Sequence, residues 1–203
     1  MFIQVIQGTC RDADTVHRQM DDWRSRLESG AAGFLGGTYG ITDDGEFIGV
    51  VRFDSKESAE RNSQRPEQGE WWAETQKCFD GAVTFHDCND VVMMLDGGSD
   101  DAQFVQVIQG QLTDPGKFRD FMSQPMDMLH TARPEIIGGT VAIDDKGFFT
   151  QTVAFRTEAE AREGERREVP SEMQEQMAQM GELMTDVSYH DLHHPWFETA
   201  PVR

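Results

Sequence analysis

The sequence contains an internal repeat, and this repeat restricts the possible folds more than any other feature. The segment Phe2–Gly8 (FIQVIQG) recurs as Phe104–Gly110 (FVQVIQG), at an offset of 102 residues. At this offset, 19 of the 61 residues in positions 2–62 are identical to their counterparts. After two inserted residues the offset becomes 104, and His86-Asp87 then matches His190-Asp191. A repeat of this length indicates two copies of one structural unit.

The repeat also predicts the domain boundaries. We expect the first copy to span residues 1–96 and the second to span residues 104–203. The segment between them, residues 97–103, begins with two glycines, a serine and two aspartates. Such a polar, glycine-rich stretch has little to bury and is typical of a linker.

The first half of each copy reads as a strand followed by a helix. Residues 2–8 carry apolar side chains on both faces, which predicts a central strand covered on both sides. Asp12 is a suitable N-cap for a helix running to about residue 29. In the second copy, Pro125 should kink or interrupt the corresponding helix. The apolar positions of the first helix fall on one stripe: Val16, Met20, Trp23 and Leu27.

The second half of each copy reads as two strands, a helical region and a last strand. Strands at about 34–42 and 46–53 are joined by Asp43-Asp44-Gly45, a strong hairpin signal. A helical region follows over about 55–80, broken near Pro66. Its counterpart in the second copy carries methionines at helical spacing, and a stripe of this kind is typical of a core. These methionines are Met173, Met177, Met180 and Met184.

The resulting order, βαββαβ, is the ferredoxin-like arrangement. An antiparallel sheet with both helices on one face leaves its other face uncovered, and two such sheets can cover each other. The predicted fold class is therefore α+β, with two tandem ferredoxin-like units whose antiparallel sheets pack face to face as an intrachain α+β barrel. This would be a pseudo-dimer within one chain, and further pairing into a homodimer is left open.

Composition restricts the partners and the compartment. The chain has 37 acidic and 18 basic residues, a formal net charge of −19, which disfavours nucleic acids and anionic membranes as partners. The three cysteines, Cys10, Cys78 and Cys88, lack metal-binding or redox spacing and suit a reducing cytosol. No apolar stretch approaches the roughly 18 residues of a membrane span, and no leader-like segment opens the sequence. We therefore expect a cytoplasmic protein.

This pattern resembles the dimeric α+β barrel superfamily, especially its antibiotic-biosynthesis-monooxygenase-like branch. The resemblance rests on the order of elements, the FIQVIQG strand, the Gly36-Gly37-Thr38 strand and the Asp-Gly hairpin. It implies a pocket between sheet and helices in each half. Members include cofactor-independent monooxygenases that act on polycyclic aromatics, haem-degrading enzymes and lactone isomerases. The haem-degrading members use an Asn on the first strand with a Trp and a His on helices, whereas this chain has Gln7 and Gln109 there and no His in either later helix.

Two pairs of polar residues are shared by the copies and are candidates for a site. His86 and His190 are candidate catalytic residues, because a strand-end histidine can act as a general base near neutral pH. The alternative is a structural histidine, since neighbouring strand residues point to opposite faces and each His should not meet its own Asp. Gln4 and Gln106 are candidate ligand-binding residues on an otherwise apolar face, where buried amides need hydrogen-bond partners.

Trp71 and Trp72 complete the candidate ligand-binding residues. Neighbouring helix positions do not face the same way, so we expect one indole to be packed and the other to line a pocket. The segment from His190 to His194 superficially resembles a metal cluster, but strand alternation separates its side chains, and no metal site is predicted.

The sequence therefore predicts a small-molecule protein resembling cofactor-independent monooxygenases, with an apolar or aromatic ligand between sheet and helices and no cofactor. The alternative is a non-catalytic binding or structural α+β barrel module. In that case large side chains, such as Phe47, Phe148, Phe149 and the methionine stripe, would fill the interior.

Overall fold

The computed structural model describes residues 1–95, 97, 100–123 and 127–199. The chain forms two compact units: unit 1 comprises Met1–Asn89 and Trp196–Arg203, and unit 2 comprises Asp90–Pro195. The ends of the compact units thus differ from the repeat boundaries predicted above, because the last strand of the second copy belongs to unit 1. Positions 98 and 99 of the predicted linker lie outside the described residues.

Unit 1 has the predicted βαββαβ order, with its second helical region in two pieces. The break falls at Pro66, which occupies the first turn of the second piece. The elements are β1 (Phe2–Cys10), α1 (Ala13–Arg26), β2 (Phe34–Ile41), β3 (Glu46–Phe53), α2 (Lys56–Ser63), α3 (Pro66–Thr75) and β4 (Phe79–Met94), with short 3-10 turns at Glu28–Gly30 and Gln76–Cys78.

Unit 2 repeats this order. The helix after its first strand is interrupted as expected, although Pro125 itself lies outside the described residues. The elements are β5 (Phe104–Leu112), α4 (Pro115–Met122), α5 (Asp127–Ala132), β6 (Ile136–Asp144), β7 (Phe148–Phe155), α6 (Glu158–Glu165), α7 (Ser171–Gly181) and β8 (Met184–Leu192). The α+β class with two ferredoxin-like units is therefore confirmed, while the face-to-face packing of the sheets stays a prediction.

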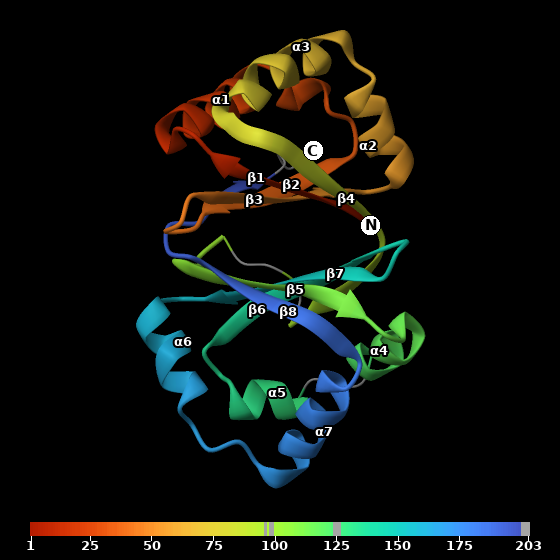
Figure 1. Ribbon diagram of the computed structural model, residues 1–203, viewed down its shortest axis with the longest axis vertical. Coiled ribbons are helices and arrows are strands. Elements are labelled where there is room, and N and C mark those ends of the chain that lie inside the picture. The colour runs from red at the N-terminus through yellow and green to blue at the C-terminus, as the bar shows by residue number, and fades with distance from the viewer. Residues whose placement is uncertain (96, 98–99, 124–126, 200–203) are drawn as a thin grey trace. The chain divides into compact units, whose positions relative to one another are not determined.

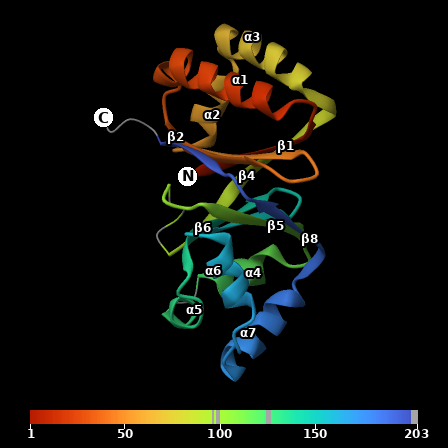
Figure 2. The ribbon, with the colours of Figure 1, turned by 90° about the vertical axis from the view of Figure 1, so that its left-hand side faces the viewer.

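In each unit the helices cover one face of an antiparallel sheet (Figures 1 and 2). The strand order is β4-β1-β3-β2 in unit 1 and β8-β5-β7-β6 in unit 2. The central strand β1 places Gln4 opposite Asp87 and Val5 opposite His86. Strand β5 places Gln106 opposite Asp191 in the same way. Because Phe2 and Ile6 pack among the helix-facing core residues, Gln4 and Asp87 lie on the helix side of the sheet.

Each sheet gains a fifth strand that the repeat did not predict. Strand β9 (Trp196–Thr199), which follows β8 in the chain, pairs with β2 of unit 1. In unit 2, β4 lies beside β6, and residues 90–94 at its end belong to that unit. In both cases the extra strand is the continuation of the last strand of a repeat, and it covers an edge that would otherwise be open to pairing.

The helix caps and core stripe follow from the sequence. The Asp12 carboxylate accepts a hydrogen bond from the Thr15 backbone N–H, and Asp114 accepts one from Lys117 in the second copy. The predicted stripe on α1 is buried, and in unit 2 Phe118 and Met122 are buried at the equivalent positions. Phe47 on β3, which recurs as Phe149 on β7, packs in the same core cluster as Val16 and Met20 of α1.

The repeated Gly-Gly pair makes room for the fifth strand and for one aromatic ring in unit 1. Gly36 has a φ of +138°, and a Cβ there would lie 2.5 Å from the carbonyl oxygen of Glu198 on β9. A Cβ on Gly37 would overlap the hydroxyl of Tyr39, whose ring crosses Gly37 to reach the Glu198 carboxylate. Only glycine permits both approaches.

We therefore predict that Gly37→Ala lowers the free energy of unfolding by about 2 to 3 kcal/mol, through overpacking and loss of the Tyr39–Glu198 hydrogen bond. Gly69→Ala is the matched control, because Gly69 lies within α3 with nothing within 4 Å of its added methyl group. It should stabilise the protein by about 0.5 to 1 kcal/mol. Urea denaturation of both variants measures the difference, and equal stabilities would contradict the prediction.

Candidate functional site

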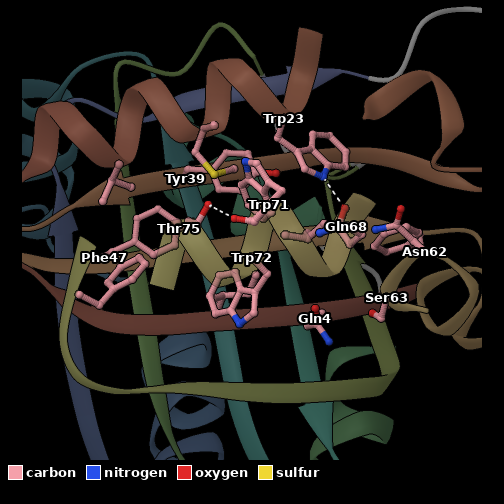
Figure 3. A pocket seen from close by; sticks show the side chains of 16 residues that line it. Gln4, Trp23, Tyr39, Phe47, Asn62, Ser63, Gln68, Trp71, Trp72 and Thr75 are labelled. Carbon is pink, nitrogen blue, oxygen red and sulfur yellow. Dashed lines mark hydrogen bonds between the residues drawn. The ribbon is translucent and has the colours of Figure 1, made fainter. Parts of the chain in front are cut away.

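Each unit contains a cavity between its sheet and its helices. The cavity of unit 1 has a volume of about 70 Å³ and is enclosed by side chains from both layers (Figure 3). Seven of its lining residues are aromatic: Trp23, Tyr39, Phe47, Phe53, Trp71, Trp72 and Phe79. This space is below the range of about 300–1,000 Å³ typical of small-molecule sites.

Hydrogen bonds hold two of these indoles in place. The Trp23 Nε1–H donates to the Gln68 side-chain oxygen at 2.7 Å, and the Trp71 Nε1–H donates to the Gln19 backbone carbonyl at 2.9 Å. The Thr75 hydroxyl in turn donates to the Trp71 carbonyl within α3. The walls of the unit 1 cavity are therefore rigid and aromatic.

The cavity of unit 2 is larger, with a volume of about 430 Å³. Its walls carry six methionines: Met94, Met122, Met173, Met177, Met180 and Met184. Polar groups interrupt this surface at Gln106, Gln151, Gln176, Arg133 and Glu165. A mostly apolar cavity of this size with a few polar groups has the general character of a ligand site.

The difference between the cavities follows from a few substitutions between the repeats. Trp72 of unit 1 corresponds to Gln176 in unit 2, and both line their cavities. Tyr39 corresponds to Val141. Replacing an indole and a phenol by smaller side chains removes side-chain volume from the interior of unit 2.

The strand glutamines form hydrogen bonds as expected for buried amides, while their role in binding a ligand stays a prediction. Gln4 and Gln106 each line the cavity of their unit. The Gln4 amide donates to Asp87 Oδ1 at 2.8 Å, and the Gln106 amide donates to Asp191 Oδ1 at 3.0 Å. The side-chain NH₂ group of each glutamine is thus a donor to an aspartate, and its side-chain oxygen can act as an acceptor.

His86 and His190 lie elsewhere. Strand alternation directs them to the sheet face opposite the helices, beside Val5 and Val107, and neither is among the residues that line these cavities. The His190 Nε2 lies 3.0 Å from the Ser188 hydroxyl. This geometry gives no support to a catalytic role of either histidine in the cavities, and the aspartate of each His-Asp pair is the one on the cavity side.

Two expectations about packing need correction. Trp71 and Trp72 both line the unit 1 cavity and both pack against its core, because two positions about 100° apart can border the same space. The methionine stripe of unit 2 is not simply core. Met173 is buried, but Met177 is 47% exposed, and all four residues of the stripe line the cavity.

A cation borders the unit 2 cavity. Arg133, on the segment before β6, lines the cavity and forms an ion pair with the buried Glu135. Arg167 binds the other oxygen of Glu135 at 2.8 Å. Burial alone would raise the pKa of Glu135, but hydrogen bonding to Arg133 and the two positive charges lower it. Two guanidinium groups therefore share the Glu135 carboxylate, and Arg167 also pairs with Glu163. Arg133 is the basic residue among the described residues that line the cavity.

A buried acid contacts Tyr39, one of the residues that line the unit 1 cavity. Glu198 on β9 is 5% exposed and accepts a hydrogen bond from the Tyr39 hydroxyl at 3.2 Å. Burial raises the pKa of Glu198 to about 7, partly opposed by the Tyr39 hydrogen bond. Burial, followed by the nearby Glu198 charge, raises the pKa of Tyr39 well above its usual value.

Within the described residues, no group of three or more His, Cys, Asp or Glu side chains is arranged to hold a metal ion. His193 instead contacts Glu158 at 3.0 Å. None of the described helices combines the length and apolar character needed to cross a bilayer.

Comparison with known proteins identifies the fold. No protein-family model and no curated protein matches the chain. A "putative monooxygenase" from Fusobacterium nucleatum superposes with a TM-score of 0.74 at 10% identity, covering 98% of this chain and 94% of the other. One from Lactobacillus acidophilus gives 0.70 at 11% identity, with 100% and 98% covered. An "anthrone oxidase-like protein" gives 0.66 at 7% identity, with 99% and 94% covered.

This chain has the fold of these proteins. The fold expected from the sequence is thus confirmed over the whole chain and therefore over both repeats. Within this monooxygenase-like fold, sequence reasoning missed Arg133, Tyr39 and Glu198. Arg133 gave no signal because distant segments build the cavity that it lines, and Glu198 gave none because its partner Tyr39 is distant in the chain.

The buried Glu198 predicts a pH dependence of stability. Between about pH 4.5 and pH 7 the unfolded chain loses this proton while the folded chain keeps it, so stability falls as pH rises through this window, on the order of 2 kcal/mol. Glu198→Gln keeps an acceptor for Tyr39 and should remove this fall. Melting temperatures at pH 5 and pH 8 test it, with the exposed Glu70→Gln as control. If the melting temperature of Glu198→Gln falls between pH 5 and pH 8 as much as that of the wild type, Glu198 is not the cause of the pH dependence.

Proposed function

We propose that this protein binds an apolar, aromatic small molecule in the cavity of unit 2 and oxygenates it without a metal or nucleotide cofactor. The observation that carries the proposal is the cavity of about 430 Å³ between sheet and helices. It lies in a fold shared with proteins described as monooxygenases and anthrone oxidase-like.

The walls of this cavity suit a flat, apolar ligand with one or two oxygen atoms. Methionine side chains are flexible and polarisable, and they contact aromatic rings favourably. Phe121 and Phe155 add aromatic surface. The Gln106 amide, held by Asp191, offers an acceptor to a hydroxyl group, and Gln176 offers a second polar group.

Arg133 and Glu165 supply the groups that the chemistry would need. An activated CH₂ group next to an aromatic ketone can lose a proton, and the resulting carbanion can react directly with O₂. The CH₂ becomes C=O, one oxygen atom is retained and the other leaves as water. The Arg133 guanidinium would stabilise the enolate oxygen, and the Glu165 carboxylate at the rim would accept the proton.

A second candidate function is binding without catalysis. The nearly filled cavity of unit 1 favours it for that unit, because aromatic side chains occupy the space that a large ligand would need. Oxygen uptake distinguishes the two functions for unit 2. An enzyme consumes O₂ in step with the substrate, whereas a binding module retains the ligand unchanged.

The repeat itself supplies the variant that tests the cavity. Gln176→Trp places the indole of unit 1 at the equivalent position of unit 2, and it should fill the cavity and weaken anthrone binding at least about tenfold by exclusion. Glu175→Trp is the matched control, because this neighbouring side chain is exposed and lies outside the cavity lining. Equilibrium titration with anthrone and oxygen-electrode measurements give both readouts.

The outcomes separate the alternatives. Loss of binding and of oxygen uptake in Gln176→Trp alone supports a catalytic cavity. Binding without oxygen uptake in the wild type supports the binding module. Unchanged binding in Gln176→Trp would refute the assignment of the ligand to this cavity, and loss of turnover in His190→Ala would direct attention to the opposite sheet face.

A further inference from the structure

The small cavity of unit 1 has features that the proposed function does not use. Its three indoles meet at angles: Trp23 and Trp71 lie 6.5 Å apart at 60°, and Trp71 and Trp72 lie 6.1 Å apart at 45°. Tilted rings enclose a space from several sides (Figure 3). The hydrogen bonds of Trp23 and Trp71 fix their edges, so this enclosure exists before any ligand binds.

Charged groups adjoin this cavity without lining it. One of them is basic: the Arg65 guanidinium donates to Oδ1 of the lining residue Asn62 at 2.9 Å and also pairs with Glu67. Among the described residues that line it, none is basic. A more open hollow of about 180 Å³ shares Gln4 and Ser63 with the cavity and carries the carboxylates of Asp87 and Glu60. Asp87 is held in place by the Gln4 amide at 2.8 Å. A positive ligand entering through this hollow would meet acidic groups first and aromatic faces next.

Aromatic faces carry negative potential and attract cations, most strongly at Trp. A methylated ammonium group is the cation best suited to a closed aromatic site, because it is weakly hydrated and gives up little solvation energy. The volume of about 70 Å³ equals that of two or three water molecules. It therefore suits a group of a few methyls and excludes a polycyclic ring system.

We propose that unit 1 contains a second binding site, specific for a small organic cation with a methylated ammonium group. The cationic head lies among Trp23, Trp71 and Trp72, and Asp87 and Glu60 balance its charge from the adjoining hollow. The site is independent of the proposed oxygenation in unit 2, whose cavity lacks tryptophan and is bordered by Arg133. The repeats have thus diverged toward ligands of different chemistry.

Intrinsic fluorescence can test this site in the full chain, because all four tryptophans, including Trp196 of β9, belong to unit 1. The probes are choline and its neutral isostere 3,3-dimethylbutanol, titrated at constant ionic strength, with calorimetry as a second measure. We expect choline to bind with an affinity at least about tenfold higher than the isostere, since only the cation gains the attraction of the rings. Equal affinities would mean an apolar pocket and would overturn the proposal, as would the absence of choline binding.

Variants locate the site. Trp72→Leu should weaken choline binding at least about tenfold, and Trp72→Phe, which keeps an aromatic face, should recover part of it. Trp72 is partly exposed, so both proteins should fold, and their melting curves check this. Asp87→Asn should weaken binding several-fold, whereas Glu70→Gln, which removes an exposed acid outside the lining, should not. Unchanged binding in Trp72→Leu would overturn the proposal.

Discussion

The backbone of each βαββαβ unit fixes the separation between its sheet and its helices, and the side chains in between decide whether that space is filled. In unit 1 the indoles of α1 and α3 occupy most of it, and their hydrogen bonds to Gln68 and the Gln19 carbonyl prevent their withdrawal. In unit 2 smaller and more flexible side chains leave a large cavity. The same fold therefore encloses two cavities of different size and lining.

Much of this architecture could be predicted from the sequence, because it depends on local patterns. The Asp12 cap, the break at Pro66 and the helix-side position of Gln4 each follow from neighbouring residues and periodicity. The repeat strengthens each prediction, since the same pattern occurs twice. The equivalent contacts Gln4–Asp87 and Gln106–Asp191 illustrate this, because the same alternation of side chains along the strands occurs in both copies.

The remainder depends on contacts between distant segments. Strand β9 could not be assigned to unit 1 from periodicity, because its partner strand β2 lies far away in the sequence. Tyr39 on β2 pairs with Trp196 and donates a hydrogen bond to Glu198, which follows it by 159 residues. The histidines were singled out because both copies keep them, yet they face away from the cavities. Retention in a repeat reflects structural requirements as well as function, and alternation along the strand places Asp87 and Asp191, rather than the histidines, on the helix side of the sheet.

If a ligand enters the cavity of unit 2, the methionines that line this cavity report on its binding directly. Methyl-¹³C-methionine NMR spectra, recorded while anthrone is added, distinguish the walls of the two cavities. We expect the methyl signals of Met173, Met180 and Met184 to shift, while those of Met1 and the unit 1 residue Met20 do not. A shift at Met20 without one at Met180, or no shift at any cavity methionine, would contradict it.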